Sequence, residues 1–366
     1  MPLHRVFIAN RGEIAVRILR TCRRLGIETV LGASEADLDS VGARLADRVI
    51  CIGGPRSADS YLNVAAVVGA ARNAGADAIH PGYGFLSENR KFAAACAAAD
   101  IVFIGPTEAQ LDAVGDKLKA RTNAVSAGLP VVPGGEASEL QSAQTLAKEI
   151  GFPVLIKAVG GGGGRGMKPV HDLAGLEHAM NLAASEAQAA FGDPRVYLER
   201  LVTSGRHVEV QVLGDGNNVI HLGTRDCSVQ RRYQKLVEEA PAPDLSEKLR
   251  SGLHDAAVKF GRHLAYRGLG TVECLVDRER DTFYFLEMNA RIQVEHPVTE
   301  AITGLDLVEE QIRIAEGQPL RYRQEDVSFN GHAIECRLNA EDWTHDFRPN
   351  PGTVDAAIFA AGPGIR

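Results

Sequence analysis

Residues 157–167 read K-A-V-G-G-G-G-G-R-G-M and contain five consecutive glycines. Consecutive glycines lose considerable backbone entropy when they become ordered, so such a loop is expected where the backbone must approach a ligand closely. Successive backbone amides can also cradle phosphate oxygens. Residues 154–158 and 167–170 are strand-like. The pattern therefore predicts a strand, a glycine loop and a second strand that together form a flexible lid over a triphosphate.

Two better-known glycine motifs fit this loop poorly. Gly161, Gly163 and Gly166 satisfy G-x-G-x-x-G, but the dinucleotide-binding fingerprint requires a helix after the loop. The lysine that a Walker loop needs after its last glycine is absent. Lys157 lies in an apolar strand, so we expect its ammonium to meet an anion. A surface hairpin, with Lys157 extending its charge into water, is the alternative.

Upstream of the glycine loop, short apolar runs alternate with helical patterns. Such repeated βα units predict a doubly wound parallel sheet with helices on both faces. The expected strands are residues 6–9, 29–33, 48–52, 78–80 and 101–104, and the expected helices are 13–25, 61–74 and 91–99.

Downstream, the pattern predicts an α+β unit with antiparallel pairing. Its expected strands are residues 208–212, 219–222, 270–276 and 282–288, with a helix over 247–266. A third segment begins near Gly331 with an expected strand over 332–338, and we expect it to stop at Arg366 before a domain is complete.

Residues 283–299 read F-Y-F-L-E-M-N-A-R-I-Q-V-E-H-P-V-T and alternate polar with apolar side chains. If this segment stays extended, one face is polar or charged throughout, because alternate residues of a strand share a face. An exposed sheet face would give the same alternation. The polar positions are Glu287, Asn289, Arg291, Gln293 and Glu295.

A second carboxylate, Glu273, lies between apolar neighbours in T-V-E-C-L. A buried ionised Glu is costly unless it is paired or bound to a metal. Because a charged turn over residues 277–281 follows, a hairpin could bring Glu273 and Glu287 together. Two carboxylates and an amide oxygen suit Mg²⁺, with ATP phosphates completing its shell. Arg291 could hold a small planar anion through paired hydrogen bonds.

Other polar segments are less specific. His207, Glu209 and Gln211 share one face of an expected strand, which a half-buried strand explains as well as a ligand does. Residues 227–235 form a polar, basic segment where an anion could dock, or a solvated loop. Residues 80–88 follow a strand, as binding turns do in open α/β sheets.

Composition excludes several classes of protein. The 366 residues carry a net charge of -7 without a basic stripe, which disfavours nucleic acid as a partner. No apolar run is long enough to span a bilayer. The six cysteines show no paired spacing and are expected to be reduced thiols of a cytoplasmic protein.

Taken in order, these segments resemble the biotin carboxylases, a family of ATP-grasp enzymes. The resemblance covers essentially the whole chain and implies three domains: an N-terminal Rossmann-like domain over residues 1–114, an ATP-grasp domain over 115–322 with its lid over about 130–203, and the start of an incomplete C-terminal α+β domain over 323–366. The motifs that carry it are I-A-N-R-G-E-I-A-V-R-I from Ile8, H-P-G-Y-G-F-L-S-E-N from His80, G-D-K from Gly115, the glycine loop from Lys157, R-D-C-S-V-Q-R-R from Arg225, K-L-V-E-E-A-P-A-P from Lys235, E-M-N-A-R-I-Q-V-E-H-P-V-T-E from Glu287 and E-C-R-L-N-A-E-D from Glu335.

The resemblance implies Mg-ATP (or Mn-ATP) and bicarbonate as substrates, with biotin on a biotin carboxyl carrier protein as the carboxyl acceptor. It also implies a carboxyltransferase component as a partner and a homodimer for the full-length protein. The carboxylation of biotin would then be the first half-reaction of acetyl-CoA carboxylase, as in fatty acid biosynthesis, or of another acyl-CoA carboxylase.

The resemblance implies a role for each matching residue. Glu295 would activate bicarbonate as a base, and Arg337 would stabilise the enolate-like form of the biotin ureido group. Bicarbonate would be held by Lys235, Arg291, Gln293 and Val294, and the metal by Glu273, Glu287 and Asn289. The expected ATP contacts are Lys117, Lys157, Gly163, Gly164, Glu199, Arg200, Val202, His207, Gln230 and Tyr233.

The sequence departs from the family pattern at two positions and leaves two other functions open. Tyr233 stands where many family members have a histidine, so nucleotide affinity could differ, and Ala290 replaces a common threonine or proline. A non-catalytic nucleotide-binding remnant, acting through partner binding, is one alternative. A different ATP-grasp ligase is the other, and the segment from Arg291 to Glu295 together with Arg337 speaks against it.

Overall fold

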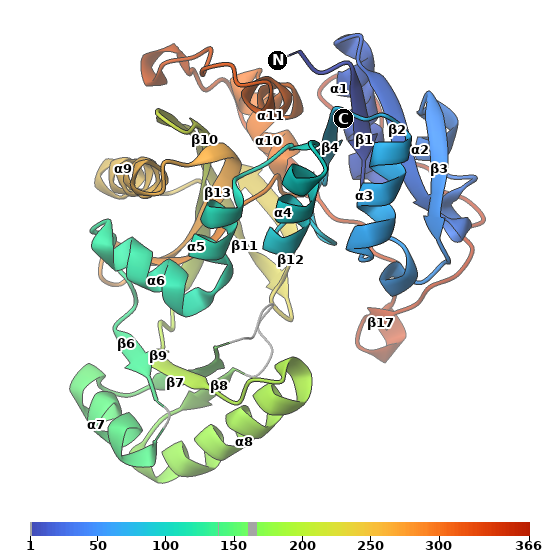
Figure 1. Ribbon diagram of the computed structural model, residues 1–366. Coiled ribbons are helices and arrows are strands. Elements are labelled where there is room, and N and C mark those ends of the chain that lie inside the picture. Colours follow the sequence, from blue (N-terminus) through green and yellow to red (C-terminus); the bar gives the residue numbers. More distant parts are fainter. Residues whose placement is uncertain (1, 138, 160–166) are drawn as a thin grey trace. The chain divides into compact units, whose positions relative to one another are not determined.

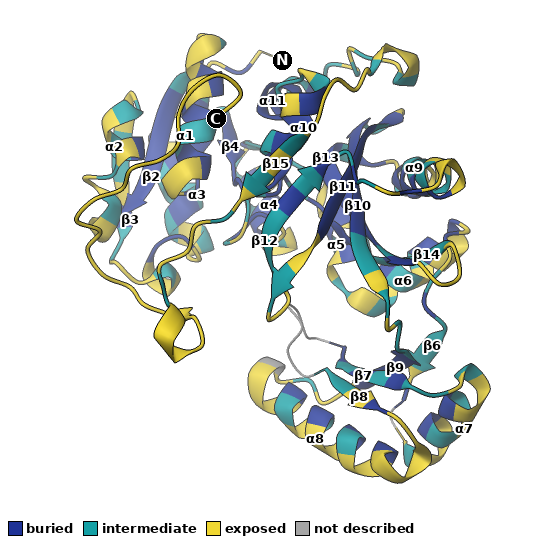
Figure 2. Cartoon of the chain, turned by 180° about the vertical axis from the view of Figure 1, so that it is seen from behind, coloured by how far each residue is buried: buried dark blue, intermediate teal, exposed yellow. Residues whose placement is uncertain are grey.

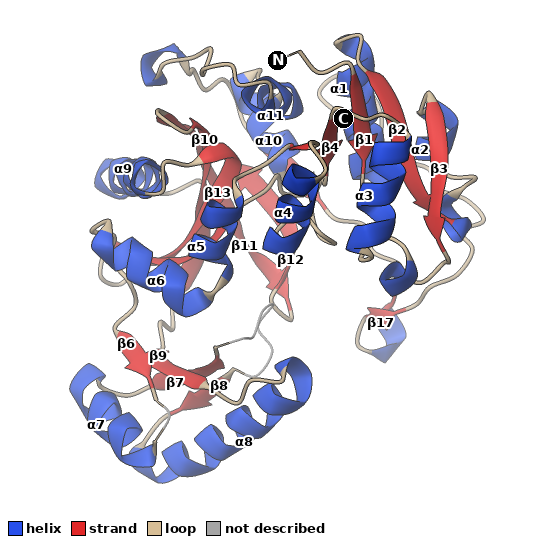
Figure 3. Ribbon diagram, viewed as in Figure 1, coloured by secondary structure: helices blue, strands red, loops and turns tan. Residues whose placement is uncertain are grey.

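The computed structural model describes residues 2–137, 139–159 and 167–366. The chain divides into two compact units, Met1–Glu335 and Cys336–Arg366. The described part of the first unit contains three sheets (Figures 1 and 3). No helix of the described residues is long and apolar enough to cross a membrane.

The N-terminal sheet confirms the predicted parallel α/β organisation. Its strands follow the order β3-β2-β1-β4-β5, and β1 pairs in parallel with both β2 and β4. Helix α3 begins at Val64, later than expected, because the Asn63 side chain caps it by accepting a hydrogen bond from the Ala66 N–H. The elements are β1 (Arg5–Ile8), α1 (Gly12–Arg24), β2 (Glu28–Ser34), α2 (Val41–Leu45), β3 (Arg48–Gly53), α3 (Val64–Asn73), β4 (Ala78–His80), α4 (Arg90–Ala98) and β5 (Val102–Phe103).

Two helices and a small sheet follow. The sheet has the strand order β6-β9-β7-β8, and α7 and α8 pack on it over an apolar core that includes Val154, Ile156 and Leu198. In Figure 2 the outer sides of both helices are exposed. The elements are α5 (Glu108–Gly115), α6 (Lys117–Ser126), β6 (Gly134–Glu136), α7 (Leu140–Ile150), β7 (Val154–Ala158), β8 (Lys168–Val170), α8 (Leu173–Phe191) and β9 (Val196–Arg200).

The larger antiparallel sheet, as predicted for the second half, follows the order β14-β13-β10-β11-β12, with β15 next to β12. Helix α9 packs against β10 and β11. The elements are β10 (Gly205–Asp215), β11 (Val219–Arg231), β12 (Gln234–Ala240), α9 (Glu247–His263), β13 (Arg267–Asp277), β14 (Thr282–Asn289), α10 (His296–Thr303), α11 (Leu307–Ala315) and β15 (Ala333–Cys336).

Strand β10 is buried on both faces. Its apolar face, which includes Val208 and Val210, packs in a hydrophobic core. Its polar face carries Glu209 and Gln211, and both of these residues are 0% exposed. A half-buried strand does not describe this element. Since buried polar side chains need polar partners, the sheet must supply them on this face.

Residues 283–299 stay extended only in their first half. Strand β14 ends at Asn289, and helix α10 begins at His296. The intervening residues form loops and turns in place of an extended strand. Arg291, Gln293 and Glu295 therefore reach their positions from a loop.

The second unit is short and contains the hairpin β16 (Glu341–Asp342) and β17 (Arg348–Pro349). The strand expected over residues 332–338 is β15, which stops at Cys336. Arg337 therefore follows the strand and belongs to the second unit.

Candidate active site

Three glutamates lie in one row across the larger sheet. Glu209 on β10 pairs in register with Glu273 on β13, and Glu273 pairs with Glu287 on β14. Directly opposed residues of antiparallel strands carry their side chains on the same face. The hairpin predicted to join Glu273 and Glu287 is confirmed, and Glu209 extends the row by one strand.

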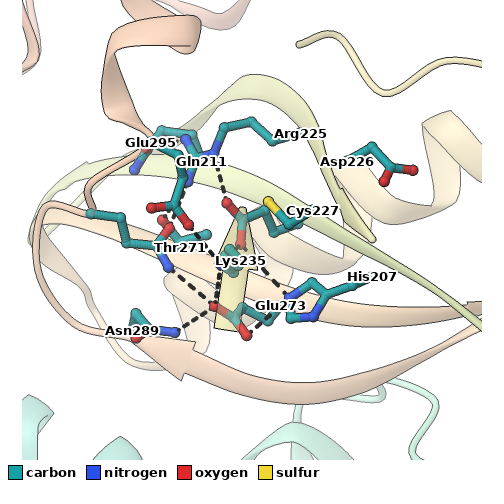
Figure 4. Close-up of polar contacts among 12 residues, drawn as sticks. His207, Gln211, Arg225, Asp226, Cys227, Lys235, Thr271, Glu273, Asn289 and Glu295 are labelled. Atoms are coloured by element: carbon teal, nitrogen blue, oxygen red, sulfur yellow. Dashed lines mark hydrogen bonds and ion pairs between the residues drawn. The ribbon is translucent and has the colours of Figure 1, made fainter. Parts of the chain in front are cut away.

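Lys235 on β12 neutralises much of this negative charge. Its Nζ donates to Glu209 Oε2 at 2.6 Å, to Glu273 Oε1 at 3.0 Å and to Glu295 Oε1 at 2.6 Å. Burial lowers the pKa of Lys235, but the charges of these three carboxylates outweigh it and raise the pKa well above its ordinary value. Lys235 is therefore a fixed cation at the centre of the cluster (Figure 4).

His207 contacts the same cluster from β10. Its Nε2 lies 3.0 Å from Glu273 Oε2, and its Nδ1 lies 3.1 Å from Gln230 Nε2. Burial opposes protonation of the ring, yet the hydrogen bond and charge of Glu273 outweigh it and raise the pKa of His207. The Gln230 amide also donates to the Cys227 carbonyl at 2.7 Å, which fixes its orientation.

The carboxylate pair has the chemistry of a magnesium site. Burial raises the pKa of Glu287, and the charge of Glu273 raises it further. Within the described residues no cationic side chain forms an ion pair with Glu287. A hard divalent cation would supply the missing positive charge, since it prefers carboxylate oxygens.

Asn289 is a weaker candidate for a metal ligand than the two glutamates. Its Nδ2 donates to Glu273 Oε1 at 2.9 Å, and its Oδ1 accepts from Arg291 Nη2 at 2.5 Å. The amide oxygen can therefore offer a cation only its second lone pair. Two other sets of side chains lie close enough together to hold a metal ion. One is His207, Glu209 and Glu273, and the other is Glu209, Cys227 and Glu295.

Arg291 comes from the loop after β14 and is held by Glu88 of the N-terminal region. Its Nε donates to Glu88 Oε2 at 2.8 Å, and its Nη1 donates to the Ile292 carbonyl at 3.2 Å. The Glu88 carboxylate also accepts from the Ala290 N–H at 3.0 Å. With the bond to Asn289, three of the five N–H groups are used within the described structure. Two N–H groups remain for an anion.

A cavity of about 450 Å³ adjoins the carboxylate row, between the small sheet and the larger one. Lys157 and Glu199, on adjacent strands of the small sheet, form an ion pair at its wall. Leu155, Leu201 and Leu275 supply apolar lining, which suits a base or a sugar face. A second cavity shares Lys117 and Glu287 with it and adds Glu88 and Asn289.

All the predicted nucleotide contacts within the described residues line the first cavity. Tyr233 is 61% exposed and lies in the β11–β12 hairpin turn with a φ of 65°. Gly163 and Gly164 lie outside the described residues. The lining set comprises Lys117, Lys157, Glu199, Arg200, Val202, His207, Gln230 and Tyr233, together with Glu273 and Glu287.

Comparisons with known proteins agree with this geometry. A sequence family described as "Biotin carboxylase, N-terminal domain" matches residues 2–111, and one described as "Carbamoyl-phosphate synthase L chain, ATP binding domain" matches residues 116–323. The biotin carboxylase of Nostoc sp. is 52% identical over 369 residues, which cover 100% of this chain and 82% of that protein. Biotin carboxylase 1 of Bacillus subtilis is 49% identical, with the same coverage of 100% and 82%.

The chain belongs to the biotin carboxylase family. A crystal structure of the Campylobacter jejuni biotin carboxylase with a β,γ-ATP ligand superposes with a TM-score of 0.94 at 50% identity and covers 99% of this chain and 81% of that one. The biotin carboxylase domain dimer of Hydrogenobacter thermophilus 2-oxoglutarate carboxylase, in complex with MgADP, ADP and bicarbonate, superposes with a TM-score of 0.93 at 46% identity, covering 99% and 80%.

Several of the residues predicted to bind or activate bicarbonate lie close together in this structure. Gln293 is 3% exposed, and its Nε2 donates to Glu273 Oε1 at 3.1 Å. Glu295 is 2% exposed and is joined to Gln293 through Lys235 and Glu273. Val294 is half-buried in the same loop. Arg337 lies in the second unit, so its assigned contact with biotin stays a prediction.

The sequence assigned no role to Glu88 or Arg225, and for Glu209 it left a ligand role and a half-buried strand equally open. Glu88 and Arg225 stand in motifs that carry the family resemblance, and Glu209 alternates with valines on β10. That alternation indicates which residues share a face, but it does not indicate which strands become neighbours. Only the strand order places Glu209 beside Glu273.

Proposed function

We propose that this chain catalyses the ATP- and bicarbonate-dependent carboxylation of biotin attached to a biotin carboxyl carrier protein. One observation carries the proposal: a row of three register-paired carboxylates adjoins a nucleotide-sized cavity, and Lys235 and Gln293 donate to this row directly while Arg291 reaches it through Asn289. The activity of the relatives supports it, because members at about half identity over the whole chain are biotin carboxylases.

ATP would occupy the cavity lined by Lys117, Lys157, His207 and Gln230. The Lys157–Glu199 pair fixes one cation at the cavity wall, where it can meet a phosphate oxygen. Glu273 and Glu287, with Asn289 as an additional oxygen donor, would hold Mg²⁺ or Mn²⁺. The bound ion would supply positive charge to the phosphoryl oxygens of the nucleotide.

Bicarbonate would lie against Arg291, Gln293, Val294 and Lys235. The two remaining N–H groups of Arg291 match a planar anion with two oxygens. Glu295 is the group suited to accept the bicarbonate proton, because it is a carboxylate whose Oε1 accepts from Lys235 Nζ at 2.6 Å, beside the expected anion site. The deprotonated anion then attacks the terminal phosphoryl group of ATP and gives carboxyphosphate and ADP.

Carboxyphosphate releases CO₂ beside the biotin ureido group, and the phosphate formed takes the proton of the biotin nitrogen. That nitrogen attacks CO₂ and gives carboxybiotin. Arg337 is assigned to the developing ureido oxyanion, for which a guanidinium is the appropriate charge. The protein contributes positioning and fixed charges and forms no covalent bond to the substrate, as is usual in phosphoryl transfer.

A carboxyltransferase component is the expected consumer of carboxybiotin, in acetyl-CoA carboxylase or another acyl-CoA carboxylase. A homodimer and a cytoplasmic location complete the proposal. The named Hydrogenobacter structure, a dimer of biotin carboxylase domains, supports the dimer.

ADP formation measured with Mg²⁺, with and without bicarbonate and free biotin, tests the proposal. The expected result is turnover that requires bicarbonate and rises with biotin. Nucleotide binding without turnover would instead indicate a non-catalytic remnant, and turnover that requires an amine would indicate a different ATP-grasp ligase.

A further inference from the structure

Arg225 on β11 is a fully buried arginine whose hydrogen-bonding capacity is completely used. Its side chain is 0% exposed. Nε donates to Glu209 Oε1 at 2.6 Å, Nη1 donates to Gln211 Oε1 at 2.6 Å and to Thr299 Oγ1 at 2.9 Å. Nη2 donates to Thr271 Oγ1 at 3.1 Å and to Gln293 Oε1 at 2.6 Å. Because a guanidinium has five N–H groups, Arg225 has none left for a substrate.

This saturation separates Arg225 from Arg291. Arg291 retains two N–H groups for an anion within the described structure, whereas Arg225 gives every donor to protein oxygens. Arg225 can therefore influence the reaction only through the groups that it holds.

Two of those groups belong to the site. Arg225 occupies the amide oxygen of Gln293, so the Gln293 N–H₂ group must point the other way, where it meets Glu273 Oε1 at 3.1 Å. The opposite amide orientation would place N–H₂ against the guanidinium and the oxygen against the Glu273 carboxylate. A hydrogen-bond network of this kind decides the orientation of a buried amide.

Arg225 also divides the two oxygens of Glu209. Oε1 accepts from Arg225, and Oε2 accepts from Lys235 at 2.6 Å. Glu209 therefore links Arg225 to Lys235, whose ammonium also donates to Glu273 and Glu295.

We propose that Arg225 is a positioning residue for bicarbonate: it aims the Gln293 amide N–H₂ and, through Glu209, the Lys235 ammonium at the anion. This inference rests on the proposed function and adds a residue to it. Supporting groups that orient ligand-binding side chains commonly matter about 10- to 100-fold for affinity or activity.

Arg225→Lys tests the proposal. Lysine keeps the charge, but it lacks the planar, branched guanidinium that contacts Glu209 and Gln293 at the same time. The expected result is a bicarbonate KM raised about 10-fold, with a smaller change in the ATP KM. Arg206→Lys is the matched control: Arg206 forms a partly buried ion pair with Asp226 at 2.5 Å on the neighbouring strands. It should leave the bicarbonate KM unchanged.

A double-mutant cycle with Gln293→Met shows whether Arg225 acts through Gln293. The effects of the two substitutions on the bicarbonate KM should be strongly non-additive, since residues of one network share their energy. If Arg225→Lys is insoluble, Thr271→Val replaces it. That variant removes the second acceptor of Nη2, and it should raise the bicarbonate KM more than the ATP KM.

Additive effects, or equal changes in the two KM values, would overturn the positioning role while wild-type turnover still supported the proposed function. A wild-type protein with no bicarbonate-dependent ADP formation would overturn both.

Discussion

Glu273 and Glu287 lie directly opposite each other in the β13–β14 pair, and Glu209 continues their row on β10. Three neighbouring carboxylates on one sheet face repel one another, so the row persists only with cations beside it. Lys235 supplies one such charge between Glu209 and Glu273. The end of the row at Glu287 has no such ion pair within the described residues, which is where a metal–nucleotide complex fits.

Lys235→Gln should abolish most activity and also destabilise the fold. The substitution leaves three buried carboxylates without their shared cation, and breaking a buried ionic group costs about 3–5 kcal/mol. We expect bicarbonate-dependent ADP formation to fall at least about 100-fold, as for loss of one charge-stabilising donor. Lys168→Gln is the control, because Lys168 pairs with Glu186 near the surface. Equal losses in both variants would contradict the role of Lys235.

Glu287→Gln should stabilise the protein while weakening its metal-dependent nucleotide binding. Burial and the Glu273 charge raise the pKa of Glu287, so its ionised form costs folding energy that a neutral amide avoids. We expect a higher Tm, weaker binding of ADP with Mg²⁺, and unchanged binding of ADP in EDTA. Calorimetric titration and thermal unfolding measure these quantities. A lower Tm with equal losses in both titrations would mean that Glu287 serves the fold.

The His221–His254 stack predicts a pH dependence of stability. The rings lie 3.8 Å apart between centroids, and burial lowers the pKa of His221 from 6.5 to about 4 and that of His254 from 6.5 to about 3. The unfolded chain therefore binds these protons first. The contribution of these two neutral histidines to the free energy of unfolding is fully present above pH 6.5. It is lost as the pH falls toward 4, by up to about 1.4 kcal/mol per pH unit for each histidine.

The nearby charges act in opposite directions: Asp255 favours protonation of His221, and Arg250 disfavours protonation of His254. Replacing His254 with Gln should make the fall in Tm between pH 7 and pH 5 shallower. His178→Gln on exposed α8 should leave it unchanged. An identical pH profile for wild type and His254→Gln would refute the assignment.

Much of this site follows from local sequence patterns. Alternation and the charged turn over residues 277–281 place Glu273 and Glu287 on one hairpin, and the glycine-rich sequence predicts a phosphate-binding loop. Arg225 illustrates what local patterns miss, because its partners come from β10, β13, the loop after β14 and α10. Such partners depend on strand order. The alternation over residues 283–299 does not by itself show where β14 ends, because polar and apolar residues continue to alternate through the loop.

The most direct test of the central claim is a crystal structure of this chain with Mn²⁺, ADP and bicarbonate, with the ion located by its anomalous scattering. We expect an anomalous peak between the carboxylates of Glu273 and Glu287, ADP in the adjoining cavity and the anion against Arg291 and Gln293. A peak elsewhere, or nucleotide bound without any ion at these two glutamates, would contradict it.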